Sequence, residues 1–312
     1  MPDVPSPLPL PTKPASNEPS DPAAEASAEH LNSSDRDSAA MKFYGPRPAW
    51  QLIDIAELWR YRELILAYGY RDLAVRYRQT AVGVLWALLQ PLGTVVVFGV
   101  LIHWLRGNAS DGTLPYAVTS LCGMVPWQFF AATVSGATLS IALNAPLIKK
   151  VYFPRVILPL SAFIPASVDF VIAAGLLLTV MLWYGIVPGW SILLMPLLLV
   201  ATLIVSAAIS LWLSALNGIY RDVQFAVPFA LQLGMIISPV VYETEAVVPE
   251  QWQPLYYLNP LAGLIQCYRA VLLGSPFPSL TSLAISSVGV TVLLVAGAVY
   301  FRRMERHFAD IA

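Results

Sequence analysis

The sequence predicts an all-α polytopic membrane protein with six transmembrane helices. Of its 312 residues, 57% are hydrophobic and only 12% are charged, whereas an ordinary soluble domain has about a quarter charged residues. Most of its apolar stretches are long enough to cross the hydrocarbon layer as helices, which takes about 20 residues. The six stretches that we interpret as spans are 81–105, 116–143, 156–187, 190–216, 225–241 and 280–301.

The chain begins with a polar segment, residues 1–48, which is rich in Pro, Ser, Ala, Asp and Glu. Such a segment cannot bury enough apolar surface to offset the entropy lost on ordering. We therefore expect a disordered cytoplasmic tail. It lacks the basic start and short apolar core of a secretory signal peptide.

Residues 49–80 predict an amphipathic helix lying at the cytoplasmic membrane surface before the first span. Asp54 and Glu57 have the spacing of a capping box, and we expect a break near Gly69. At about 100° per residue, one face of this helix is apolar. That face consists of Ile55, Trp59, Leu66, Leu73 and Tyr77. Whether the helix is only a surface anchor or also takes part in the mechanism stays open.

The fifth stretch, 225–241, contains Pro228 and Pro239 and predicts a short, kinked or tilted helix. Between this stretch and the last span, residues 242–279 include an apolar piece, 261–273, that is too short to cross. A re-entrant hairpin on the outer face fits this piece if its ends are buried in protein or wet.

The basic residues predict the orientation, because short cytoplasmic loops accumulate Lys and Arg. With the amino terminus inside, nearly all the basic residues near the spans are cytoplasmic, while Arg106 and Arg269 lie outside. We therefore expect both termini in the cytoplasm.

Several phrases, in this order and spacing, resemble the permease subunit of ABC-type polysaccharide and polyol-phosphate exporters, the family that moves O-antigen, capsule and teichoic acid chains. The resemblance covers roughly residues 50–308. The phrases begin with Arg76-Tyr77-Arg78-Gln79-Thr80, Leu89-Gln90-Pro91, Phe153-Pro154-Arg155, Tyr220-Arg221-Asp222 and Asn259-Pro260.

The resemblance implies a channel-forming permease of an ATP-driven exporter that moves lipid-linked polysaccharide, in the first instance O-antigen, across the bacterial inner membrane. It implies as partners a second copy of the chain, two copies of a separate cytoplasmic ABC ATPase subunit, a polyprenyl-pyrophosphate-linked glycan and membrane lipid. The chain has no G-x-x-x-x-G-K-[ST] phosphate loop. ATP is therefore expected on the partner subunit, and no cofactor, metal or nucleic acid on this chain.

The first candidate site would bind the substrate headgroup at the cytoplasmic surface. The triplet Tyr-Arg-Asp occurs twice, at 70–72 and 220–222, and we expect one geometry to explain both copies. Arginine forks bind pyrophosphate bidentately, although anchoring to anionic lipid would use the same side chains. The candidates are Arg71, Asp72, Arg76, Arg78, Tyr220, Arg221 and Asp222.

The second candidate site is the turn 144–155, which combines cations with aromatic residues between prolines. The resemblance makes it the coupling element that touches the ATPase, although the positive-inside rule alone would explain its lysines. Aromatic and Arg side chains are common at protein interfaces. The coupling candidates are Lys149, Lys150, Tyr152, Phe153 and Arg155, with Arg60 and Arg62.

The third candidate site is a glycan path at Trp127, Phe129 and Phe130, because sugar rings stack on aromatic faces. Asp169 lies inside the third span, where a charge costs about 2.5–3.5 kcal/mol. We expect it to face protein or water, and a proton-coupling role stays open.

Two other functions are alternatives to a transporter subunit that is not an enzyme. An ion-coupled secondary transporter would need internal repeats and paired ionisable residues at the midplane, of which Asp169 is the one candidate. A membrane glycosyltransferase would need acidic groups on a water-exposed face, where the outer loop offers Glu243, Glu245 and Glu250.

Overall fold

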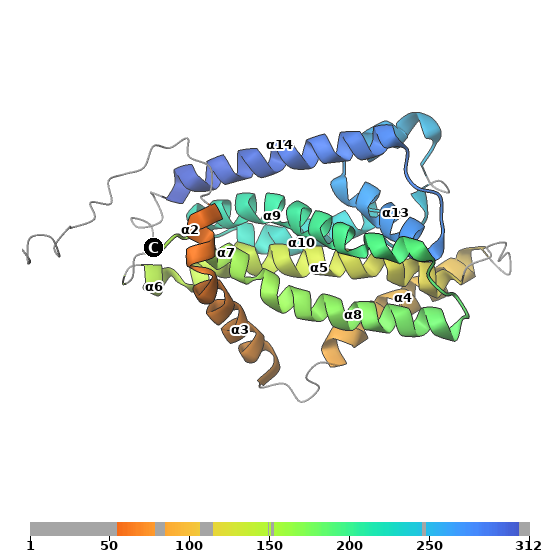
Figure 1. Ribbon diagram of the computed structural model, residues 1–312, viewed down its shortest axis with the longest axis horizontal. Coiled ribbons are helices and arrows are strands. Elements are labelled where there is room, and N and C mark those ends of the chain that lie inside the picture. The colour runs from red at the N-terminus through yellow and green to blue at the C-terminus, as the bar shows by residue number, and fades with distance from the viewer. Residues whose placement is uncertain are drawn as a thin grey trace, which may run out of the picture. The chain divides into compact units, whose positions relative to one another are not determined.

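The computed structural model describes residues 55–78, 85–106, 115–148, 150, 153–244 and 248–305. The expected tail and the capping residue Asp54 lie outside these residues. In the described part of the chain every regular element is a helix, which confirms the all-α class. Figure 1 shows the long helices α5, α8, α9 and α14 running alongside one another.

Four described segments are long and apolar enough to cross a membrane, and they match four of the predicted spans. The first is α5 (Tyr116–Leu143), and the second joins α7 (Ile157–Ser161) to α8 (Phe163–Trp183). The third joins the 3-10 helix η1 (Trp190–Leu194) to α9 (Met195–Ile219), and the fourth is α14 (Leu280–Glu305).

The other two predicted spans fall on helices whose described apolar parts are shorter than a typical span, so the count of six stays a prediction. The stretch 81–105 falls on α4 (Leu85–Arg106), in which Leu88–Val97 is the described apolar part. The stretch 225–241 falls on α10 (Val223–Ile237), which has 15 residues, fewer than the 20 or so of a typical span. This helix ends because Ser238 precedes a proline and adopts extended backbone, with ψ 149°.

Helix α5 is the central helix of the bundle. In its most apolar 18-residue stretch, 78% of the residues are buried, whereas the corresponding share in each of the other three spans is 28% or less. It packs against α4, α8, α9, α10 and α13. On α9, small polar residues recur at every fourth position and are all buried, which lets neighbouring helices approach closely. These residues are Thr202, Ser206, Ser210 and Ser214.

The segment between α10 and α14 contains the 3-10 helix η2 (Glu250–Trp252), α12 (Gln253–Tyr256) and α13 (Pro260–Leu273). The Asn259 Oδ1 atom caps α13 by accepting from the Leu261 N–H at 3.1 Å. The helix ends at Gly274, whose φ of 72° favours glycine. Residues 261–272 are all buried, so the short apolar piece is covered by protein, while the re-entrant hairpin stays a prediction.

The segment predicted to be a surface helix is divided into α2 (Ile55–Arg60) and α3 (Arg62–Arg78). The expected break near Gly69 is wrong, because the break falls at Tyr61. Gly69 lies inside α3, buried against Ile164 of α8. The predicted apolar face is divided: Trp59 and Leu66 are 70% and 58% exposed, whereas Leu73 and Tyr77 are half-buried against the protein. The placement of this helix at the membrane surface stays a prediction.

We predict that Gly69→Ala lowers the stability of the protein. A Cβ atom at this position would lie 2.3 Å from Ile164 Cδ1 and 2.6 Å from Ile164 Cβ. Because Ile164 Cβ is tied to the α8 backbone, α3 would have to move, at a cost of about 1–3 kcal/mol. Thermal unfolding in detergent measures this as a lower Tm.

The matched control is Gly175→Ala in α8, where an added Cβ meets nothing within 4 Å. Alanine is the better helix former by about 0.5–1 kcal/mol, so this variant should keep or raise Tm. Equal shifts for the two variants would contradict the close contact between α3 and α8.

Candidate functional site

A cavity of about 520 Å³ opens between α3, α4, α5, α8 and α10. Its wall joins charged, amide, hydroxyl and aromatic side chains, which is the mixture that polar ligands with ring systems require. The residues of the wall that carry such groups are Arg76, Tyr77, Gln90, Thr94, Trp127, Gln128, Phe129, Ser135, Asp169 and Phe170.

Asp169 has two partners on α3. Arg76 Nη1 donates to Asp169 Oδ2, and the Tyr77 hydroxyl donates to Asp169 Oδ1. Burial raises the pKa of the Tyr77 phenol to about 12, and the hydrogen bond to Asp169 acts in the same direction. The carboxylate therefore faces protein, as expected for a charge inside a span.

The aromatic candidates are all buried, at 5%, 1% and 4% exposure for Trp127, Phe129 and Phe130. Trp127 and Phe129 reach the cavity wall. Phe130 packs against Trp127 with ring centroids 5.5 Å apart and is not among the wall residues. The cavity thus brings together one headgroup candidate, Arg76, and two residues of the predicted glycan path.

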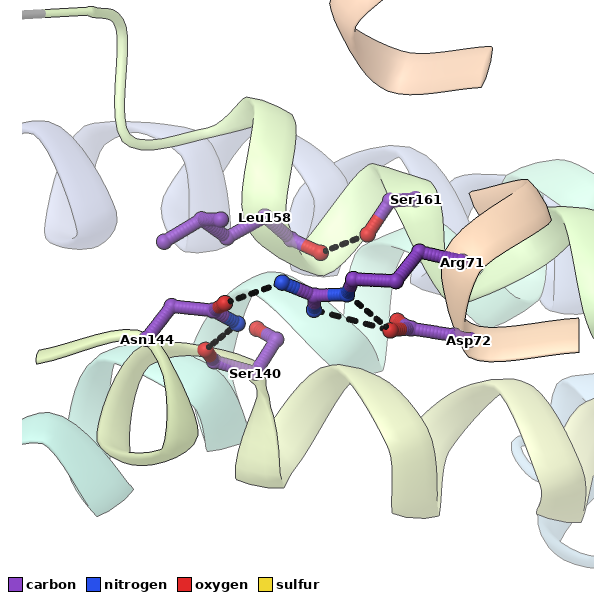
Figure 2. A network of polar contacts seen from close by, with 6 residues as sticks. All are labelled: Arg71, Asp72, Ser140, Asn144, Leu158 and Ser161. Atoms are coloured by element: carbon purple, nitrogen blue, oxygen red, sulfur yellow. Dashed lines mark hydrogen bonds and ion pairs between the residues drawn. The ribbon is translucent and has the colours of Figure 1, made fainter. Parts of the chain in front are cut away.

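Arg71 is engaged within the chain, as Figure 2 shows. Its Nε and Nη2 atoms donate to Asp72 Oδ1 at 3.0 and 2.8 Å, and Nη1 donates to Asn144 Oδ1 at 3.0 Å. Asn144 Nδ2 in turn donates to the Ser140 carbonyl at 2.7 Å. The Arg71 guanidinium also lies 4.9 Å from the centre of the Tyr68 ring. Arg71 therefore pairs with the neighbouring Asp72, and most of its fork is occupied by partners inside the chain.

The second triplet has a different geometry, so the expectation of one shared geometry is wrong. Residues 70–72 lie within α3, whereas Tyr220, Arg221 and Asp222 form an exposed turn between α9 and α10. Arg78, the last residue of α3, is also exposed.

The turn 144–155 contains α6 (Ala145–Ile148) and an exposed Lys150. Lys149 and Tyr152 lie outside the described residues. Phe153 is only 6% exposed and lies 6.3 Å from the Tyr68 ring, so it supports the turn from inside instead of offering a docking surface.

Arg155 connects the end of this turn to the last turn of α14. Its backbone N–H donates to Glu305 Oε1 at 3.1 Å, and its guanidinium donates to the Glu305 carbonyl. The two further coupling candidates, Arg60 and Arg62, are exposed, and the Arg62 guanidinium lies over the Trp59 ring.

Sequence reasoning missed several residues of the site, namely Tyr77, Gln90, Thr94, Gln128 and Asn144. Amide and hydroxyl side chains inside apolar spans are a recognisable signal, because their polar atoms need partners in the membrane. Gln90 and Gln128 could have been singled out in this way. The pairing of Tyr77 with Asp169, 92 residues away, leaves no local pattern.

Comparisons with known proteins identify relatives along most of the chain. A family model described as ABC-2 type transporter matches residues 63–273. The chain is 30% identical over 258 residues to the O-antigen export system permease protein RfbA of Myxococcus xanthus, covering 82% of this chain and 98% of that protein. It is 27% identical over 254 residues to the protein of the same name from Klebsiella pneumoniae, covering 80% and 95%. Identity to the polysialic acid transport protein KpsM of Escherichia coli is 21% over 253 residues, covering 75% and 91%.

We predict that Arg76→Ala and Asp169→Ala are coupled in their effects on stability. Arg76→Ala leaves the Asp169 carboxylate with Tyr77 alone, while the double variant removes both charges. Because the pair is partly exposed, at 46% and 23%, we expect a coupling free energy of about 1 kcal/mol. A double-mutant cycle on thermal unfolding in detergent measures it, and additive losses would contradict the pairing.

Proposed function

Because this multi-pass membrane chain belongs to the ABC-2 type transporter family, we propose that it is the channel-forming permease of an ATP-driven exporter. The exporter moves a lipid-linked polysaccharide of the O-antigen class across a bacterial inner membrane. Two copies of the chain associate with two copies of a separate cytoplasmic ABC ATPase, and both termini are cytoplasmic. The alignment to O-antigen export permeases along 95% or more of their length supports this substrate class.

The cavity is the observation that carries the proposal. Arg76 and Tyr77 place a guanidinium and a hydroxyl at one part of its wall, and such donors suit the oxygens of a pyrophosphate. Trp127 and Gln128 of the same wall offer a ring face and an amide to a sugar. Both donors now bind Asp169, so an arriving headgroup would exchange with this carboxylate.

An ion-coupled secondary transporter is the second candidate, because Asp169 is a carboxylate inside a span. Its hydrogen bonds to Arg76 and Tyr77 give it a role in holding α3 that requires no proton transfer. The exporter proposal therefore explains the presence of Asp169 inside a span without assigning it a proton-coupling role.

We predict that the purified chain binds an ABC ATPase and that undecaprenyl pyrophosphate stimulates ATP hydrolysis by the complex in phospholipid vesicles. Arg76→Ala should raise the half-maximal concentration of this lipid by about tenfold to a hundredfold, because a charge-assisted hydrogen bond is lost. Arg76→Lys, which keeps the charge and loses the fork, should fall between Arg76→Ala and the unmodified protein.

A different result would favour the ion-coupled transporter. Transport by the chain without an ATPase, abolished by collapsing the proton gradient and by Asp169→Asn, would replace the exporter with the ion-coupled transporter.

A further inference from the structure

Helix α3 carries two polar anchors on neighbouring turns. Arg71 donates to Asn144 at 3.0 Å, and Arg76 and Tyr77 donate to Asp169. The positions of Arg71 and Arg76 are separated by about 7.5 Å along the helix axis. The first anchor therefore contacts the start of the turn 144–155, and the second contacts the wall of the cavity.

The first anchor lies where α5 meets the turn. Asn144 follows the last residue of α5, and its backbone carbonyl accepts from Leu147 and Ile148 of α6 at 3.0 and 3.1 Å. Its side chain bridges the Ser140 carbonyl and the Arg71 guanidinium (Figure 2). A movement of α6 thus acts directly on the residue that holds Arg71.

The far end of the turn also contacts α3. Phe153 packs against the Tyr68 ring, and the same ring lies beneath the Arg71 guanidinium. Gly69, the next residue, lets the α3 backbone approach Ile164. Because α3 is a continuous helix of 17 residues and packs along α7 and α8, a displacement at Arg71 is passed along the helix to Arg76.

We propose that α3 is the mechanical link between the turn 144–155 and the cavity, and that Asn144 and Arg71 are its positioning residues. They hold Arg76 and Tyr77 in register with Asp169. This inference rests on the proposed function, because it assumes that the turn meets the ATPase and that the cavity receives an anionic headgroup. Since coupling between two binding events is reciprocal, headgroup binding at Arg76 acts back on the turn by the same route.

We predict that Asn144→Ala uncouples the two sites whereas Asn144→Asp does not. Both variants lose the Nδ2 donation to the Ser140 carbonyl, but alanine also removes the acceptor of Arg71, whereas aspartate keeps an Oδ atom in its place. In the ATPase complex, reconstituted in vesicles of phosphatidylethanolamine and phosphatidylglycerol, undecaprenyl pyrophosphate is the probe. The measured quantity is the ratio of stimulated to basal hydrolysis, which should fall towards one in Asn144→Ala and stay at the unmodified level in Asn144→Asp.

A second measurement follows the cavity without the ATPase. Ser135→Cys places a thiol on the cavity wall, and the native Cys122 and Cys267 are buried, so they contribute little background. Release of Arg76 and Tyr77 from Asp169 should change the rate at which a water-soluble maleimide labels this thiol by severalfold in Asn144→Ala, but not in Asn144→Asp.

The outcomes separate the two levels of the proposal. If the probe stimulates the unmodified complex and Asn144→Ala changes neither the ratio nor the labelling rate, α3 is not the link, and the exporter stands. If the probe stimulates no complex, the headgroup assignment fails, and the labelling rate still decides whether Asn144 positions α3. A loss in Asn144→Asp equal to that in Asn144→Ala would also overturn the role of the Arg71 contact.

Discussion

Close packing of α5 against α9 is the constraint on which the other helices depend. Lipid tails are as apolar as leucine, so helices in a membrane associate through tight contact and shared hydrogen bonds. The buried serine and threonine residues of α9 remove bulk at every fourth position, and Asn217 Nδ2 donates to the Thr138 carbonyl of α5 at 2.8 Å. With α5 fixed in the centre, α4, α8, α10 and α13 all pack on it, and its remaining surface becomes a cavity wall.

The cavity wall contains an ion pair between Asp169 of α8 and Arg76 of α3. Asp169 belongs to a span, whereas Arg76 does not. An unpaired carboxylate on α8 would be costly in hydrocarbon, and α3 supplies a guanidinium and a hydroxyl to it. The pairing requires α3 to lie against α8, which Gly69 permits by leaving room for Ile164. Helix α3 is therefore part of the cavity wall.

The sequence predicted what depends on local composition and missed what depends on distant contacts. Four spans were recognisable because an apolar run of sufficient length is itself the signal. The partner of Asp169 was not, because Arg76 lies 93 residues away. Phe153 looked like a surface aromatic beside lysines, yet Tyr68 buries it. Gly69 suggested a break because glycine weakens helices, but here its missing side chain serves packing.

The turn 144–155 is held at its two ends by different elements, which gives it two routes into the protein. Its start is joined through Asn144 to α3 and so to the cavity. Its end is joined through Arg155 to Glu305 of α14, a helix that packs against α9 and also contacts α12 and α13 (Figure 1). Lys150 is exposed between these attachments. A displacement of the turn therefore acts on the cavity through α3 and on α12 and α13 through α14, because each end of the turn is attached to a different helix.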